Sequence, residues 1–149
     1  MIAQLGDFRM GYDDSGEGLP VVFLHGFPHD RNLWNAQRLA LSSQARCIVP
    51  DLRGFGHSST HGPFSVDQYA DDVIALLDAL QVERAVVCGL SMGGYVAMAL
   101  WRRHPDRVKA FVFCDTKAGA DSEEARQRRD ELAALVRKDG ARAIAEAQI

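Results

Sequence analysis

The sequence predicts an α/β protein, with a mostly parallel sheet of about six strands covered by helices on both faces. Two observations lead to this class. Short apolar runs alternate along the chain with stretches of helical periodicity, an order that favours parallel strands joined by crossover helices. The 149 residues are 47% hydrophobic, which is enough to bury one sizeable core.

Each element follows from a local pattern. Apolar or alternating residues predict strands at 2–5, 8–12, 20–24, 46–49, 85–88 and 109–114. Helical spacing and helix-start residues predict helices at 31–41, 65–80, 92–103, 122–138 and 141–147. The first two strands should form a hairpin, and the polar cluster at 13–18 should be a turn. We expect Asp30 to cap the first helix, and Asp121, with Glu124 three residues on, to cap the helix at 122–138.

Composition and charge restrict the partners of the chain. The formal net charge is −3, and acidic and basic residues are interspersed, so nothing favours nucleic acid or an anionic membrane. No apolar run is long enough to span a bilayer. The three cysteines, Cys47, Cys88 and Cys114, fall in predicted strands, which favours reduced thiols over disulfides. We therefore expect a soluble protein of the cytoplasm.

The most informative segment joins the strand at 85–88 to the helix at 92–103. Gly89, Ser91 and Gly93 form a G-x-S-x-G pattern there, which is typical of a nucleophile elbow that lifts a serine hydroxyl clear of the sheet. Glycine is expected on both sides, because a Cβ atom would collide with the neighbouring strand and helix. The unsatisfied N–H groups at the start of the helix would point at the region beside Ser91.

Four ordered motifs make the chain resemble the α/β-hydrolase fold family, in particular its esterase, enol-lactonase and proline iminopeptidase branch. They stand at 25–28, 51–58, 89–94 and 104–108. The resemblance implies that Ser91 is the nucleophile and that the backbone N–H groups of Phe27 and Met92 form the oxyanion hole. Such donors are needed because acyl transfer builds negative charge on the carbonyl oxygen. The resemblance further implies a hydrolase of small carboxylic esters or related acyl compounds.

The resemblance does not supply a catalytic base. In the family the acid and the histidine follow the nucleophile along the chain, and here the only histidine after Ser91 is His104. It follows the elbow helix, roughly 20 Å from the serine end, so it is too distant to act as the base. The chain thus resembles a short form without the last strands and the catalytic histidine.

Two residues are candidates for the missing roles. Asp115 follows the strand at 109–114 at its carboxyl end, where sites of open α/β sheets form; it is either an orienting acid or a strand-end aspartate. His29 follows Phe27 on the loop expected to border the substrate. The base is then His29 or a histidine from a second chain, whereas His25 and His57 are expected to be structural.

We expect neither a metal nor a cofactor. The histidine pairs at 25 and 29 and at 57 and 61 are spaced four apart, but they fall in Gly- and Pro-containing loops where that spacing does not place two ligands on one helix face. The glycines at 54 and 56 lack the third glycine of a dinucleotide fingerprint.

The expected organisation is a hydrolase core at 1–120 followed by a helical segment at 121–149, which is lid-like or serves assembly. The strand at 109–114 would form a hydrophobic sheet edge, and such an edge is a template for another chain. We therefore predict a homodimer joined at this edge or through the terminal helices. A second functional hypothesis stays open: a scaffold with the fold but little catalysis, which needs a second chain.

Overall fold

The structure, a computed structural model, describes residues 1–60, 64–140 and 142–144. Its sheet has six strands in the order β1-β2-β4-β3-β5-β6. They are β1 Ile2–Leu5, β2 Phe8–Ser15, β3 Leu19–Leu24, β4 Ala45–Pro50, β5 Ala85–Leu90 and β6 Val108–Cys114. The chain divides into two compact units, Met1–Lys117 and Ala118–Ile149, and the sheet belongs to the first.

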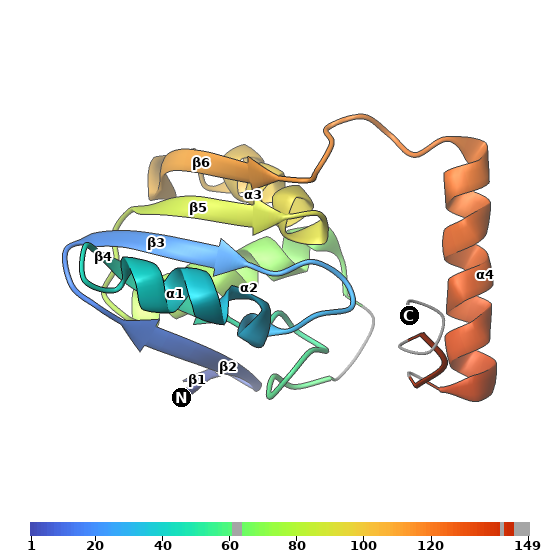
Figure 1. The fold of residues 1–149 in the computed structure, drawn as a ribbon, viewed down its shortest axis with the longest axis horizontal. Coiled ribbons are helices and arrows are strands. Elements are labelled where there is room, and N and C mark those ends of the chain that lie inside the picture. Colours follow the sequence, from blue (N-terminus) through green and yellow to red (C-terminus); the bar gives the residue numbers. More distant parts are fainter. Residues whose placement is uncertain (61–63, 141, 145–149) are drawn as a thin grey trace. The chain divides into compact units, whose positions relative to one another are not determined.

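Pairing in the sheet is antiparallel at one side and parallel elsewhere (Figure 1). The hairpin strands β1 and β2 are antiparallel, and β2 is antiparallel to β4. From β4 onward, each strand is parallel to the next one in the order β4-β3-β5-β6. The predicted six-stranded, mostly parallel sheet is therefore confirmed.

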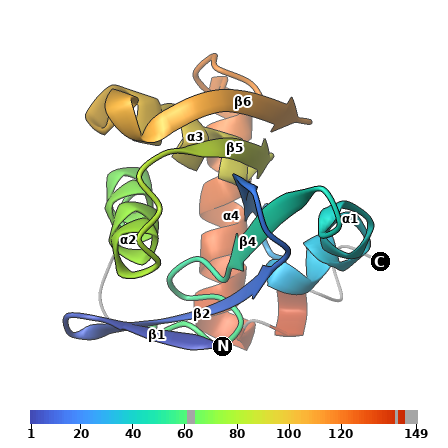
Figure 2. The ribbon, with the colours of Figure 1, turned by 90° about the vertical axis from the view of Figure 1, so that its left-hand side faces the viewer.

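Helices cover both faces of this sheet, as predicted. Figure 2 shows α1 on one face and α2 and α3 together on the other. The helical segments of the described chain are η1 Arg31–Trp34, α1 Asn35–Leu41, α2 Val66–Ala79, α3 Met92–Arg103, η2 Pro105–Arg107 and α4 Glu123–Asp139. No helix in the described part of the chain has the length and apolar character that a bilayer crossing requires.

Alternation along the central strands creates a separate apolar cluster on each face. In β3, Val22 and Leu24 belong to the larger cluster with residues of α2 and α3. Phe23 between them belongs to the other cluster, where its ring lies 5.3 Å from the ring of Trp34. Because successive side chains of a strand point to opposite faces, one apolar run supplies both clusters.

The predicted turn at 13–18 is wrong in its first half. Asp13 and Asp14 belong to β2, which extends to Ser15 and pairs with β4. Basic partners make these acidic strand residues tolerable: Arg46 holds Asp14 at 2.6 Å, and Arg31 lies 3.4 Å from Asp13. Long-range ion pairs thus override the low strand propensity of aspartate.

Two helix starts differ in detail from the prediction. Asp30 caps as expected, but the helix begins as the 3₁₀ segment η1 before continuing as α1. The cap of α4 is Ser122 and not Asp121, since the Ser122 hydroxyl accepts from the Ala125 N–H at 3.3 Å. His61 and most of the predicted helix at 141–147 lie outside the described residues.

Candidate active site

Ser91 occupies a sharp turn between β5 and α3. Its backbone has φ 49° and ψ −110°, a left-handed conformation that is costly for a residue with a side chain. Three hydrogen bonds hold it there: the Ser91 N–H donates to the Cys114 carbonyl at 3.0 Å, while the Ser91 carbonyl accepts from the Gly94 N–H at 3.0 Å and from the Thr116 hydroxyl at 2.8 Å. Both the N–H and the carbonyl of Ser91 are therefore hydrogen-bonded.

The two glycines that flank Ser91 are required by close backbone contact, which confirms the sequence prediction. A Cβ atom on Gly89 would overlap the carbonyl of Gly93 in α3. A Cβ atom on Gly93 would overlap the carbonyl of Leu24 in β3. Neither neighbour is a flexible side chain, so the strand–turn–helix geometry admits only glycine at these positions.

The loop after β3 runs beside this turn. A Cβ atom built on Gly26 would lie 3.3 Å from the Cβ of Ser91, so the backbone at 26 is packed against the serine. The His29 N–H donates to the Gly26 carbonyl at 3.0 Å and closes the loop on itself. Phe27 follows Gly26, and Met92 begins α3, where a first-turn N–H has no intrahelical acceptor. Met92 thus directly follows Ser91 in the chain, and Phe27 directly follows the glycine whose backbone packs against the serine.

His25, at the base of this loop, has a side chain whose tautomer is determined by its partners. It is fully buried. Its Nε2 accepts from the Leu52 N–H at 3.0 Å, so the proton is on Nδ1, which donates to the Gly26 carbonyl at 3.0 Å. Burial lowers the pKa of His25 from its ordinary value, because a charged imidazole would lose its hydration. The neutral ring acts as a brace between two loops.

The candidate base and acid follow, in the chain, residues that contact or hold the serine. His29 is exposed on the loop at 26–30. Asp115 is exposed, has φ 40°, and directly follows Cys114, whose carbonyl holds the Ser91 N–H. Among the described residues, no hydrogen bond joins the Ser91 hydroxyl to either side chain.

His104 lies at the opposite end of α3 from Ser91. It is the residue after the helix, and its Nε2 is 2.8 Å from an Asp71 carboxylate oxygen on α2. The Arg103 guanidinium, assisted by His104, lowers the pKa of Asp71. The last histidine of the chain therefore belongs to an ion-pair cluster between two helices.

The three cysteines are free thiols, and two of them are buried in the central strands. Cys88 is buried, and burial together with the neighbouring Cys114 raises its pKa to about 12. Burial also raises the pKa of Cys47. Since the thiolate is the nucleophilic form of cysteine, these raised pKa values make Cys47 and Cys88 poor nucleophiles. A reducing compartment, the cytoplasm, stays a prediction.

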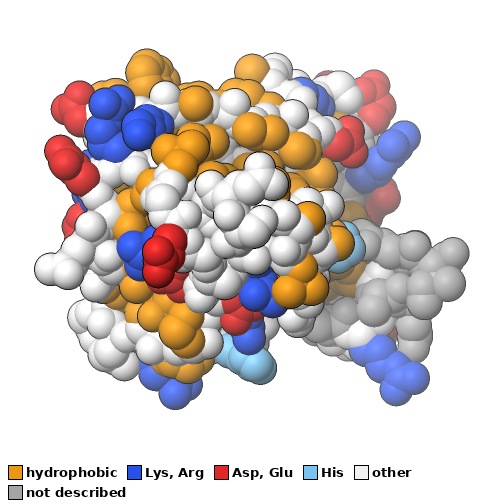
Figure 3. Space-filling model, turned by 60° about the vertical axis from the view of Figure 1, so that its left-hand side comes forward, with side chains coloured by type: hydrophobic (Ala, Val, Ile, Leu, Met, Phe, Trp, Pro, Cys, Tyr) orange, Lys and Arg blue, Asp and Glu red, His pale blue; other side chains and the backbone are white. Residues whose placement is uncertain are grey.

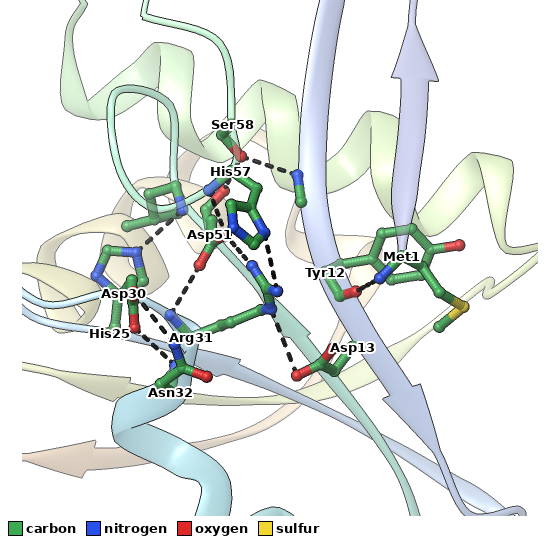
Figure 4. A network of polar contacts seen from close by, with 12 residues as sticks. Met1, Tyr12, Asp13, His25, Asp30, Arg31, Asn32, Asp51, His57 and Ser58 are labelled. Atoms are coloured by element: carbon green, nitrogen blue, oxygen red, sulfur yellow. Dashed lines mark hydrogen bonds and ion pairs between the residues drawn. The ribbon is translucent and has the colours of Figure 1, made fainter.

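Two features of the site were not predicted from the sequence. Thr116 fills the space that a Cβ on Gly94 would need, and its hydroxyl holds the Ser91 carbonyl. Asp51 lies in the motif at 51–58, yet its buried pairing with Arg31 was not foreseen (Figure 4). In each of these contacts the two residues are far apart in the sequence, so no local pattern indicates the contact.

A strand–serine–helix turn in a mostly parallel sheet, with a loop packed against the serine, defines a hydrolase-like α/β protein. Comparison with known families agrees, since the family model described as alpha/beta hydrolase fold matches residues 20–143. The chain belongs to the α/β-hydrolase fold family.

Relatives and solved structures place the chain more closely within this family. It is 38% identical over 109 residues to a 2-hydroxymuconate semialdehyde hydrolase of Pseudomonas sp. strain CF600, covering 70% of this chain and 38% of the relative. It is 36% identical over 127 residues to 3-oxoadipate enol-lactonase 2 of Acinetobacter baylyi, covering 85% and 46%. A thermophilic esterase from Thermogutta terrifontis has a TM-score of 0.90 at 45% identity, covering 97% of this chain and 54% of that structure. The chain thus spans about half the length of these relatives or less.

Proposed function

We propose that the chain acts as a serine hydrolase of small carboxylic esters or lactones, with Ser91 as the nucleophile. The observation that carries the proposal is the packing of the backbone at Gly26 against Ser91, where an added Cβ on Gly26 would lie 3.3 Å from the Ser91 Cβ. It supports the assignment of this loop as the oxyanion loop, because the serine beside it has the backbone geometry expected of an elbow. The family relatives include an esterase and an enol-lactonase, which favours an ester or lactone carbonyl as the target.

In the proposed reaction, the general base takes the Ser91 hydroxyl proton as the serine oxygen attacks the substrate carbonyl carbon, and the carbonyl electron pair moves onto oxygen. The N–H groups of Phe27 and Met92 donate to that oxyanion, which stabilises the charge as it develops. Collapse of the tetrahedral intermediate releases the alcohol, with a proton from the general base, and leaves an acyl ester on Ser91. The same base then takes a proton from a water molecule that attacks the acyl ester, and it returns this proton to the Ser91 oxygen as the carboxylic acid is released.

The base in this proposal is His29 or a histidine of a second chain, and Asp115 is the orienting acid. His29 is suited because it is exposed on the loop that also carries Phe27. Asp115 is suited because it follows the residue that anchors the Ser91 N–H. A proton acceptor in hydrogen-bond reach of the serine contributes about 10²–10⁴-fold in rate.

The test is turnover of p-nitrophenyl butyrate by the wild-type chain and by Ser91→Ala, measured side by side. The proposal expects sustained turnover that Ser91→Ala reduces at least about 10³-fold. His29→Gln should then lower the rate about 10²-fold and Asp115→Asn less. Equal, negligible rates in both proteins would overturn the hydrolase proposal for this chain and support the second hypothesis, a scaffold with the fold but little catalysis.

We also propose that two copies of the chain associate through β6. Within the described residues β6 ends the sheet and pairs with β5 alone. Its side chains are exposed for a strand, with Val112 at 47% and Phe113 at 49%. Phe111 stacks on Phe113 at 5.1 Å, and Trp101 of α3 lies 5.9 Å from Phe111. Figure 3 shows hydrophobic side chains gathered along this upper edge of the molecule.

Charge favours a second copy as the occupant of this edge. Lys109 stands at the start of β6 and Asp115 directly after its end. An antiparallel pair of β6 strands centred on Val112 would bring Lys109 of each copy opposite Asp115 of the other. The same register places Phe111 opposite Phe113, and opposite charges and aromatic pairs both stabilise cross-strand contacts. A twofold pairing of this kind is self-complementary.

Sedimentation velocity at micromolar concentration tests this association. The wild-type chain should be a dimer, Lys109→Asp should be a monomer, and Lys109→Asp with Asp115→Lys should regain the dimer. Arg9→Asp, the same charge change at an exposed residue of β2, is the matched control and should leave the dimer intact. A monomeric wild-type chain would overturn the proposal of a dimer. A dimer that persists in Lys109→Asp would overturn the β6 interface and favour association through the terminal helices.

A further inference from the structure

The carboxylate of Asp51 is fully buried directly after β4, and three donors of two other segments converge on it (Figure 4). One oxygen accepts from the Arg31 N–H at 2.8 Å. The other accepts from the His57 N–H at 2.8 Å and pairs with the Arg31 guanidinium. A buried charge is tolerated only when it is paired and hydrogen-bonded, and both conditions are met here.

Through these contacts the loop at 26–30 is tied down at both of its ends. At its start, His25 accepts from the Leu52 N–H at 3.0 Å. At its end, the Arg31 N–H donates to Asp51. The residues that hold the two ends, Asp51 and Leu52, are consecutive in the chain. Both ends of the loop that carries Phe27 are therefore attached to the same short segment. Phe55, farther along that stretch, has its ring 6.1 Å from the ring of Phe27.

The attachment stretch is itself rigidly held by β2. The Asp51 N–H donates to the Gly11 carbonyl at 2.8 Å. The Ser58 hydroxyl donates to the Asp51 carbonyl at 2.7 Å and accepts from the Gly11 N–H at 3.0 Å. A Cβ on Gly56 would overlap the Asp51 carboxylate, so the loop at 51–58 is wrapped closely around the charge.

We propose that Asp51 is a positioning residue that holds the oxyanion loop against Ser91, acting through Arg31. These contacts fix the position of the loop relative to Ser91, and with it the position of the Phe27 N–H. The pairing of Asp51 with Arg31 determines this position, and the local sequence of the loop does not. The catalytic consequence rests on the proposed hydrolase function, whereas the effect on the loop does not.

The substitution that isolates this role is Asp51→Asn, because it keeps the size of the side chain and changes only its acceptors. An amide has one oxygen for the Arg31 N–H, while its NH₂ group would face the His57 N–H and the Arg31 guanidinium. Donors would then face donors, and buried unsatisfied groups are costly. Asp14→Asn is the matched control, since Asp14 also pairs with an arginine, Arg46, at 2.6 Å but on β2.

The first measurement is amide hydrogen exchange at His29, whose N–H bonds Gly26 and not Asp51. Asp51→Asn should accelerate this exchange at least about ten-fold, which corresponds to about 1.4 kcal/mol at 25 °C, and Asp14→Asn should leave it unchanged. Arg31→Lys, which keeps a cation and the backbone N–H, should have an intermediate effect and serves if Asp51→Asn does not fold. Equal exchange in Asp51→Asn or Arg31→Lys and in the wild type would overturn the proposal.

The second measurement splits kcat from KM with p-nitrophenyl butyrate. Misplacing one oxyanion donor lowers kcat about 10²-fold, so Asp51→Asn should lower kcat by about that factor with KM changed less than about two-fold. A fall in kcat of less than about two-fold would overturn the catalytic half of the proposal. If the wild-type chain shows no turnover that depends on Ser91, the hydrolase function fails, while hydrogen exchange still decides the role of Asp51.

Discussion

The turn at 89–94 and the loop at 26–30, proposed here as the elbow and the oxyanion loop, pack against each other, but different forces hold them. The elbow is shaped by backbone overlap: a Cβ on Gly89 would strike α3, and one on Gly93 would strike β3. The loop is shaped by side chains from elsewhere, namely the ring of His25 on Leu52 and the carboxylate of Asp51 on the Arg31 N–H. Backbone overlap therefore limits the elbow, whereas hydrogen bonds from side chains of other segments hold the loop.

This difference predicts how each half of the site fails. Steric constraints between backbones cannot relax without moving a strand or a helix, so a change at the elbow should act on the whole fold. Polar tethers of a surface loop can break while the sheet stays intact, so a change there should act first on local order.

Gly93→Ala has the largest expected effect on stability. The added methyl group would overlap the backbone carbonyl of Leu24, which lies in a central strand, and overpacking of this kind costs about 3 kcal/mol or more. Chemical denaturation should show a reduced free energy of unfolding, or no cooperative transition at all.

The control for this change is Gly119→Ala, because a Cβ at that position meets nothing within 4 Å. It should shift the free energy of unfolding by less than about 0.5 kcal/mol. A Gly93→Ala protein as stable as the Gly119→Ala protein would contradict the steric account of the elbow.

His25→Gln should have an intermediate effect, of about 1–3 kcal/mol at pH 8, since one of two buried hydrogen bonds would be lost or misaligned. The same residue gives the site a pH dependence. Burial holds the folded pKa of His25 below its ordinary value of 6.5. As the pH falls below about 6.5, the unfolded state therefore takes up a proton that the folded state refuses, and stability is lost.

The measurement is urea denaturation of wild type and His25→Gln from pH 8 to pH 5. The stability advantage of the wild type should be constant above about pH 7 and should shrink as the pH falls through 6.5 toward the folded pKa. Because every other ionisable group is the same in both proteins, the difference isolates His25. An advantage that grows on acidification would mean that the buried ring is charged.

The contrast between the two regions also explains what the sequence could predict. The sheet, its helices and the elbow follow from local patterns, namely the apolar runs, the helical spacing and the glycines around Ser91. The acidic end of β2 was missed because Asp13 and Asp14 are stabilised by arginines far along the chain. The tethers of Asp51 and Thr116 were missed for the same reason, since a contact between segments distant in sequence leaves no periodic trace.

Thr116→Val should have the smallest effect on stability of the three substitutions, and it probes a point where the elbow depends on a side chain. Valine keeps the shape that fills the space beside Gly94 but loses the hydroxyl that donates to the Ser91 carbonyl at 2.8 Å. The loss of one hydrogen bond should lower the free energy of unfolding by about 1 kcal/mol. Thr116→Ser keeps the hydroxyl and loses a methyl group, so it should retain the rate at which a fluorophosphonate labels Ser91, whereas Thr116→Val should slow it. If both variants label at the wild-type rate, the steric contacts of Gly89 and Gly93 are sufficient to hold the serine, and the division between a steric elbow and a tethered loop becomes sharper.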